Sequence, residues 1–187
     1  CGYGEILKHS LIENKKFFSF LNKNLKKILS LSSPFIEKAI YESCKIKKKI
    51  VEKDEKETAL RKVLNFGHTF AHAYEAGLGY SHKLNHGEAV ILGMKTALSF
   101  SFKENMLSKS EYNLIINHID NSGLPSSIKK YFSISDLNKI LSFMIKDKKN
   151  NSEKINLVLL KKIGKPIFNK EYTKKKLNLF LKKFLTN

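Results

Sequence analysis

The chain has 187 residues, a formal net charge of +18 and 42% hydrophobic residues, which suits one globular domain with a sizeable core. Its lysines are spread along the whole sequence and form no single stripe, so we expect a solvated basic surface and no nucleic-acid partner. No apolar run approaches the roughly 18 residues of a membrane span, so no membrane partner is expected. Two cysteines are too few for a disulfide framework and favour the reducing cytoplasm.

The predicted elements are mostly helices. In chain order, the hydrophobic periodicity predicts helices over 5–12, 14–31, 33–54, 67–76, 86–102, 108–122, 135–145 and 171–185, and strands over 154–160 and 166–168. Ser33, followed by Pro34, is expected to cap the third helix, and Ser108 and Ser135 are expected to cap the sixth and seventh. The two strands should form a hairpin around Gly164. The sequence therefore predicts a mainly α, multi-helix domain with a small β-hairpin.

Four of the six histidines lie in a glycine-rich stretch, residues 65–90, and three of them have a spacing that suits one site. His68 and His72 are four residues apart, so a helix places them on one face, and His86 would join them from the start of the next helix. Zinc in catalytic sites typically takes three protein ligands and keeps one position open. The pattern therefore predicts a metal or phosphate site. On the sequence alone, three carboxylates could complete a metal site: Glu5, Glu75 and Glu88.

A second feature is a group of residues that could bind anions. Of the 35 basic residues, only Arg61 is an arginine. Because a guanidinium binds planar anions through two hydrogen bonds and an ammonium does not, we expect Arg61 to be functional. If the helices pack side by side, Lys47, Arg61, Asn65 and His72 would form a positive wall that is rich in donors. Such a wall suits a substrate with a carboxylate and a phosphate.

Three segments resemble one known family. Residues 43–94 read SCKIKKKIVEKDEKETALRKVLNFGHTFAHAYEAGLGYSHKLNHGEAVILGM and closely resemble the core of the 3-dehydroquinate synthases, which are sugar-phosphate cyclases. Residues 2–12 (GYGEILKHSLI) resemble the segment just upstream, and residues 147–166 (DKKNNSEKINLVLLKKIGKP) resemble the C-terminal stretch. The resemblance covers nearly the whole chain, but only the C-terminal domain of the family.

The resemblance also implies roles for individual residues. The family's metal ligands match Glu5, His68 and His86. Residues implied in catalysis match His72, which faces the substrate phosphate, and also Glu57 and Lys8. The family's substrate contacts match Lys47, Arg61, Asn65, His72 and Lys148, with Lys149 as the alternative to Lys148. His82 matches no ligand of the family.

The resemblance further implies an activity. The family converts 3-deoxy-D-arabino-heptulosonate 7-phosphate to 3-dehydroquinate and phosphate in the shikimate pathway, with NAD and a Zn²⁺ or Co²⁺ ion as cofactors. Residues 1–187 would then be the metal- and substrate-binding domain of a homodimeric cytoplasmic enzyme. Because the chain begins at Cys1 and has no glycine-rich phosphate loop, we expect the NAD-binding N-terminal domain to be absent and the fragment alone to be inactive.

Several alternatives stay open at this point. A different sugar-phosphate cyclase would use the same site architecture with another heptulose phosphate. A metal-dependent polyol dehydrogenase of the same two-domain plan would need no wall for a carboxylate and a phosphate. From other classes, the chain could be a lysine-rich nucleic-acid binder or a non-catalytic remnant kept for interaction.

Overall fold

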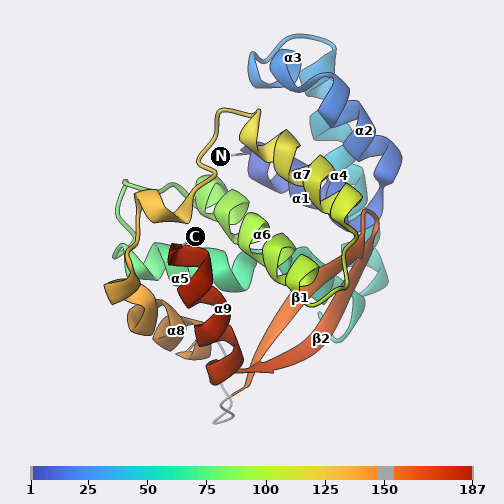
Figure 1. The fold of residues 1–187 in the computed structure, drawn as a ribbon. Coiled ribbons are helices and arrows are strands. Elements are labelled where there is room, and N and C mark those ends of the chain that lie inside the picture. Colours follow the sequence, from blue (N-terminus) through green and yellow to red (C-terminus); the bar gives the residue numbers. More distant parts are fainter. Residues whose placement is uncertain (1, 147–153, 187) are drawn as a thin grey trace.

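The computed structural model describes residues 2–146 and 154–186. In these ranges the chain is mainly helical, with one antiparallel β-hairpin, as predicted (Figure 1). In chain order the elements are α1 (Gly2–Glu13), α2 (Lys15–Lys23), α3 (Leu25–Leu29), α4 (Phe35–Lys53), the 3₁₀-helix η1 (Leu60–Asn65), α5 (His68–Gly77), α6 (His86–Lys103), α7 (Lys109–Asp120), the 3₁₀-helices η2 (Ile128–Lys130) and η3 (Ile134–Asp136), α8 (Leu137–Lys146), β1 (Lys154–Lys162), β2 (Lys165–Thr173) and α9 (Lys174–Thr186).

Helix α6 runs through the middle of the molecule (Figure 1). Helices α1, α5 and α7 and strand β1 pack around it. Most of its residues between Gly87 and Ser101 are buried, on all sides of the helix. A helix that is apolar all round belongs in an interior. Helix α6 is therefore the scaffold against which the other elements are placed, and His86 is its first residue.

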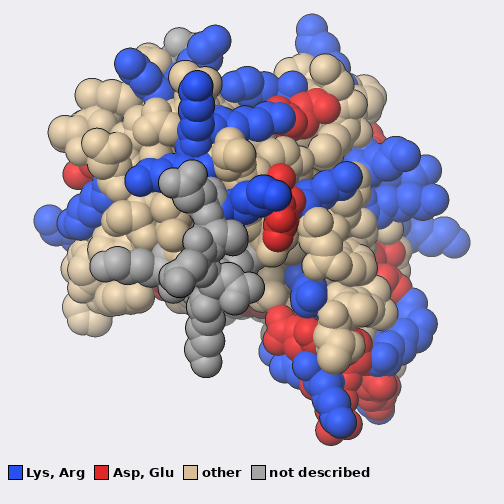
Figure 2. Space-filling view, turned by 90° about the horizontal axis from the view of Figure 1, so that it is seen from below, with Lys and Arg blue, Asp and Glu red and all other residues tan. Residues whose placement is uncertain are grey.

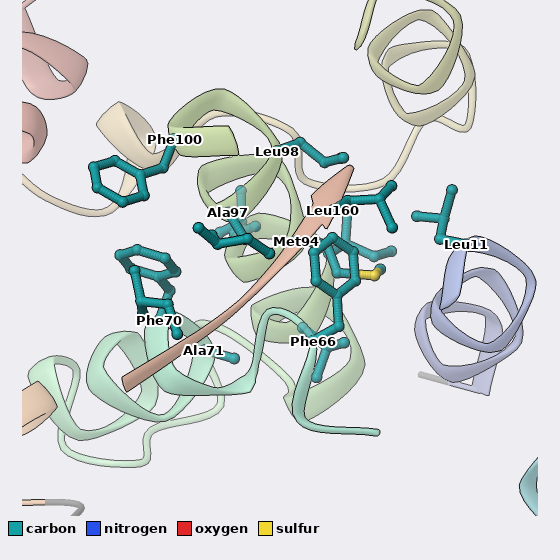
Figure 3. Close-up of a cluster of buried hydrophobic side chains, with 14 of the residues drawn as sticks. Leu11, Phe66, Phe70, Ala71, Met94, Ala97, Leu98, Phe100 and Leu160 are labelled. Carbon is teal, nitrogen blue, oxygen red and sulfur yellow. The ribbon is translucent and has the colours of Figure 1, made fainter. Parts of the chain in front are cut away.

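The core beneath the histidine stretch joins α5, α6 and β1. Figure 3 shows Phe66, Phe70, Met94, Leu98 and Leu160 in this cluster, and all five are buried. Burying a large apolar side chain contributes about 1.5–3 kcal/mol. Because the core-facing side of α5 is fixed in this way, its opposite face, which carries the histidines, has a defined position.

Two of the helix boundaries predicted in the first third of the chain are wrong. The helix expected over 14–31 breaks at Asn24, whose side-chain amide donates to the carbonyl of Phe20 at 2.9 Å. Asparagine competes for backbone groups in this way and therefore favours helix ends. The N-cap of α4 is Pro34 and not Ser33, because the chain first turns at Ser32, whose carbonyl accepts the N–H of Phe35 at 3.0 Å.

The serine caps were predicted with mixed success. Ser108 caps α7 as predicted, and its hydroxyl accepts the N–H of Glu111 at 3.3 Å. The cap expected at Ser135 is wrong, because Ser135 lies inside η3. Ser133 caps that turn instead and forms a reciprocal capping box with Asp136.

The hairpin is larger than predicted. Its strands pair from Lys154 opposite Thr173 to Lys162 opposite Lys165, so β2 extends well past the predicted end at residue 168. Residues 171–173 were expected to begin the last helix, but they pair with residues 154–156 of β1. Helix α9 therefore begins only at Lys174.

The surface and the helices bear on the partner predictions. In the face shown in Figure 2, basic side chains are scattered over several regions, with acidic ones among them. On this face the basic side chains form no single stripe, and the absence of a nucleic-acid partner stays a prediction. In the described residues, no helix is both long enough and apolar enough to cross a membrane.

Buried His118 predicts a loss of stability in mild acid. Its Nδ1 lies 2.9 Å from Asn22 Oδ1 and its Nε2 lies 2.6 Å from the Tyr3 hydroxyl, and burial lowers its pKa from 6.5 to about 4. As the pH falls below 6.5 the unfolded chain takes up a proton that the folded chain does not, until about pH 4. The neutral, buried His118 side chain therefore makes its full contribution to the free energy of unfolding above pH 6.5, and this contribution is lost as the pH falls from 6.5 to about 4.

We expect the free energy of unfolding to fall by about 2 kcal/mol between pH 7 and pH 5 from this group alone. Urea unfolding of the purified chain at both pH values measures the change. His118→Gln should show a smaller difference between the two pH values than the parent. An equal difference would mean that His118 does not carry the effect.

Candidate metal and substrate site

Close contacts between glycines bring three helices together at the site. A Cβ atom added at Gly4 of α1 would lie 2.6 Å from the carbonyl oxygen of Gly87 in α6. A Cβ atom added at Gly93 of α6 would lie 2.2 Å from the carbonyl oxygen of Gly67, the N-cap of α5. Real Cβ atoms do not approach backbone so closely, so these contacts require glycine. They place Glu5, His68 and His86, each adjacent to one of these glycines, near one another.

The three side chains form a group that could hold a metal ion. Each of Glu5, His68 and His86 offers one ligand atom, and these atoms all lie within 4.8 Å of one another. His68 Nε2 is 3.6 Å from Glu5 Oε1. The other two carboxylates considered from the sequence have different partners: Glu75 contacts His86 Nδ1 at 3.0 Å, and Glu88 accepts the N–H of Asn85 in the α6 capping box.

The hydrogen bonds of the two histidines fit a metal site. Glu75 and the carbonyl of Phe66 can only accept, so the Nδ1 atoms of His86 and His68 that face them, at 3.0 and 3.4 Å, must carry the protons. The Nε2 lone pairs are then available for coordination. Burial, assisted by the charge of Lys8, lowers the pKa of His68 to about 4, so its ring is neutral, as a ligand must be.

Glu5 supplies the strongest indication of a cation. Its Oε1 atom is buried and has no hydrogen-bond partner among the described residues, which is costly for a carboxylate. Its other oxygen accepts from Lys8 Nζ at 2.7 Å. Burial alone would raise the pKa of Glu5, but the charge and hydrogen bond of Lys8 outweigh it and hold this pKa below its usual value. An ionised oxygen that faces His68 Nε2 without a partner fits a divalent ion such as Zn²⁺.

Lys8 lies deeper than a lysine normally does. Only 3% of its surface is exposed, and burial lowers its pKa while Glu5 partly offsets this effect. The nearby charge of Lys47 lowers the pKa of Lys8 further. Lys47 itself is exposed on α4. The structure thus brings these two lysines, both predicted as site residues, to the Glu5 side of the cluster.

A cavity of about 550 Å³ adjoins the cluster at His68. Its described lining residues come from the loop before η1, from η1, from α5 and from both strands of the hairpin: Glu57, Lys62, Asn65, His68, Thr69, His72, Asn156, Leu157, Val158, Phe168 and Asn169. The rings of His68 and His72 are 5.4 Å apart between centroids, as the four-residue spacing predicted. The Asn65 amide donates to Glu57 Oε1 at 2.9 Å.

Lys47 and Arg61, two of the predicted anion contacts, are not in this lining. The Arg61 guanidinium donates to the carbonyl of Glu55 at 2.7 Å, and the backbone N–H of Arg61 is held by the carboxylate of Asp54 at 2.8 Å. Backbone hydrogen bonds, first from Arg61, lower the pKa of Asp54 to about 2. Arg61 therefore braces the loop before η1, and its contact with substrate stays a prediction. Lys148 and Lys149 lie outside the described residues.

Sequence reasoning missed seven of the described lining residues: Lys62, Thr69, Asn156, Leu157, Val158, Phe168 and Asn169. Thr69 and Lys62 adjoin predicted residues on α5 and η1, and the one available signal was this proximity. The other five belong to the hairpin, far along the chain from the histidines. Their position depends on how the hairpin packs against α6 and η1, which no local pattern reveals.

Glu75 gives a test of the metal assignment. If Glu75 holds the tautomer and orientation of His86, Glu75→Ala should weaken Zn²⁺ binding by about 10- to 100-fold, as loss of such partners typically does. Glu75→Gln should lose less, because its amide oxygen still accepts the Nδ1–H. A competition titration of the purified chain with a chromophoric chelator measures both constants. Unchanged Zn²⁺ affinity in Glu75→Ala would show that His86 is not a ligand or needs no support.

The chain matches known proteins over its whole length. The family model for the 3-dehydroquinate synthase C-terminal domain matches residues 2–150. The 3-dehydroquinate synthase of Pelagibacter ubique (strain HTCC1062) is 64% identical over 186 residues, which cover 100% of this chain and 50% of that protein. The chain thus spans about half the length of the curated relatives that it matches.

Two solved structures share the fold. One is 2-epi-5-epi-valiolone synthase from Streptomyces hygroscopicus subsp. jinggangensis 5008 with NAD⁺ and Zn²⁺ bound, with a TM-score of 0.82 and 19% identity, covering 98% of this chain and 50% of that chain. The other is 2-deoxy-scyllo-inosose synthase complexed with carbaglucose-6-phosphate, NAD⁺ and Co²⁺, with a TM-score of 0.81 and 22% identity, covering 97% of this chain and 51% of that chain. With the fold shared and the family model matched, the chain belongs to the 3-dehydroquinate synthase family and corresponds to its C-terminal domain.

Proposed function

We propose that the chain is the metal- and substrate-binding part of a 3-dehydroquinate synthase, which converts 3-deoxy-D-arabino-heptulosonate 7-phosphate to 3-dehydroquinate and phosphate. The observation that carries this proposal is the group formed by Glu5, His68 and His86 beside a cavity that also contains His72 and Asn65. The names of the curated relatives support this reaction. The ions in the two solved structures with this fold support Zn²⁺ or Co²⁺ as the metal.

A bound divalent ion would polarise hydroxyl and ketone oxygens of the substrate. Glu5, His68 and His86 would hold it, while Lys8 donates to one oxygen of Glu5 and leaves the other available as a ligand. In this proposal Lys8 also contacts the substrate hydroxyls. Because both Glu5 and Lys8 are held inside α1, their positions need little rearrangement when substrate binds.

The residues of α5 and η1 act at the phosphate end in this proposal. His72 lies one helical turn from His68 and lines the cavity, where its imidazole can hold or accept a proton beside the phosphate. Asn65 would donate to a phosphate oxygen. Its present partner is Glu57 Oε1, so the same contact keeps Glu57 at the cavity for its proposed role as proton acceptor.

The remaining proposed contacts are not among the described residues that line the cavity. Lys47 and Arg61 are proposed to bind the substrate carboxylate, and Lys148 to bind the phosphate. NAD would be bound mainly by an N-terminal domain of the complete protein; the NAD⁺ in two solved structures with this fold supports NAD as the cofactor. A cytoplasmic homodimer is part of the same proposal, and the thiol of Cys44, which is free and exposed, suits a reducing compartment.

A chimera tests this function directly. In it, the chain replaces the matching half of the Pelagibacter ubique enzyme, to which it is 64% identical. With NAD⁺ and Zn²⁺ or Co²⁺, the chimera should form 3-dehydroquinate and release equal amounts of phosphate. The unmodified Pelagibacter enzyme is the positive control. A folded, metal-loaded chimera without turnover would overturn the proposal.

A second substrate separates the proposed reaction from that of another cyclase. A heptulose 7-phosphate that lacks the carboxylate has nothing for Lys47 and Arg61 to bind. The chimera should therefore use it far less well than the heptulosonate. Equal kcat/KM for both substrates would favour a different sugar-phosphate cyclase, because binding of the carboxylate by Lys47 and Arg61 would then contribute nothing to the reaction.

A further inference from the structure

A bulge in the hairpin turns Asn169 toward the cavity. Leu157 pairs with Lys170 and Leu159 pairs with Ile167, so Val158 lies opposite two residues of β2, Phe168 and Asn169. Asn169 has φ 59°, in the left-handed region that non-glycine residues seldom adopt and that asparagine tolerates best. Bulges often re-aim a side chain beside a functional site. Here, Asn169 lines the same cavity as His68 and His72.

Lys62 meets Asn169 across the cavity wall. The Lys62 ammonium donates to Asn169 Oδ1 at 3.4 Å, a contact between residues far apart in the sequence. Because Oδ1 accepts this bond, the Nδ2 group of Asn169 keeps two donors for other partners. The pair therefore presents an ammonium and an amide, and both are donors.

The charge of this wall suits an anion. Among the described lining residues, Lys62 is the one lysine or arginine and Glu57 the one acid. Glu57 is already engaged by the Asn65 amide, whereas Lys62 forms no ion pair in the described part of the chain and contacts a neutral amide instead. Lys62 as a whole residue is half-buried, and an ammonium whose partner carries no charge gains most from a doubly charged ligand.

We propose that Lys62 and Asn169 form a binding wall for the phosphate group of the substrate. The phosphate is favoured over the carboxylate because Asn65 and His72 line the same cavity, and these two residues are the phosphate contacts of the proposed function, on which this inference rests. A phosphate has several acceptor oxygens. Asn65 on η1 and His72 on α5 would together contact only some of them. The hairpin supplies donors from a second element.

Binding of inorganic phosphate to the metal-loaded chimera tests this wall. Lys62→Ala should raise the Kd for phosphate by about fivefold or more, the scale expected for loss of one charge-assisted hydrogen bond at a partly exposed site. Asn169→Gly keeps the left-handed backbone and removes the amide, and should raise the Kd by about twofold. Isothermal titration at fixed salt gives all of these constants.

Lys170→Ala is the matched control. Lys170 neighbours Asn169 on the same strand, is exposed, carries the same charge as Lys62 and does not line the cavity. Its phosphate Kd should change clearly less than that of Asn169→Gly, by about 1.3-fold or less. If Lys62→Ala and Lys170→Ala weaken binding equally, or if Lys62→Ala leaves the Kd unchanged, the proposed wall is wrong. Lys62→Met keeps the apolar stem and replaces Lys62→Ala if circular dichroism shows that the latter is unfolded.

The kinetic result separates this inference from the proposed function. If Lys62 is a phosphate contact, Lys62→Ala should raise KM for the heptulosonate 7-phosphate by a similar factor. Normal turnover together with an unchanged phosphate Kd in Lys62→Ala would overturn the wall and leave the function standing. A chimera that turns over no heptulosonate, but whose phosphate Kd still depends on Lys62, would support the wall and overturn the function.

Discussion

His86→Ala should abolish tight metal binding while the fold remains. His86 is the first residue of α6 and its side chain is 51% exposed, so its removal leaves no cavity in the core. Its ligand atom lies within 4.8 Å of those of Glu5 and His68, and loss of one of three ligands should cost more than the 10- to 100-fold typical of an outer-shell partner. We therefore expect the Zn²⁺ affinity of the purified chain to fall more than about 100-fold.

His82→Ala is the control for this experiment. His82 lies in the loop before α6, four residues before His86, is exposed, and is not part of the cluster. It should retain the parent's Zn²⁺ stoichiometry and affinity, as measured by elemental analysis and chelator competition. Stoichiometric tight metal in His86→Ala would contradict the assignment, and so would equal losses in both variants. Loss in His86→Ala alone, with unchanged helical circular dichroism, would establish His86 as a ligand.

The metal cluster could be predicted from the sequence only in part. The spacing of His68 and His72 indicated a shared helix face, and the structure places their rings 5.4 Å apart on α5. Local pattern left the carboxylate open between Glu5, Glu75 and Glu88. The resemblance to the family selected Glu5. In the structure, the close approach of α1 to α6 places Glu5 in the cluster, and that contact is long-range and leaves no periodic signal.

The fold shows a similar division between local and long-range features. The long amphipathic and apolar helices, such as α4 and α6, follow the hydrophobic pattern closely. The break at Asn24 does not follow this pattern, because it is set by the Asn24 side chain, which caps the helix. The extension of β2 does not follow it either, because it is set by pairing with residues 154–156. Both depend on a specific bonding partner, which the spacing of apolar residues does not reveal.

The substrate cavity was the least predictable feature. Asn65 and His72 were expected to line it, but the residues of the hairpin were not. Residues 156 and 169 meet η1 and α5 only after the hairpin has packed against them. Arg61 is a different case. Its rarity in a lysine-rich chain indicated a role in binding, which stays a prediction, and in the structure its guanidinium donates to the carbonyl of Glu55. A guanidinium can bind an anion or donate to a backbone carbonyl, so composition alone could not distinguish these two roles.

Gly93→Ala should disrupt both the stability and the site. The added Cβ atom would lie 2.2 Å from the carbonyl oxygen of Gly67 and 2.9 Å from the N of Ala71, both backbone atoms of the α5 start that cannot turn aside. Helices α5 and α6 must then separate. Overpacking typically costs 1–3 kcal/mol, and because no side chain can relieve this contact we expect a loss of about 3 kcal/mol or more in the free energy of unfolding.

Gly2→Ala is the matched control, since a Cβ atom there meets nothing within 4 Å and should change stability by less than about 0.5 kcal/mol. Urea unfolding measures both variants, and chelator competition measures Zn²⁺ binding in the molecules that remain folded. Because His68 directly follows Gly67 and His86 lies on α6, separation of the two helices should also lower the affinity for Zn²⁺. Reduced stability with unchanged Zn²⁺ affinity would show that the distance between α5 and α6 does not set the geometry of the cluster.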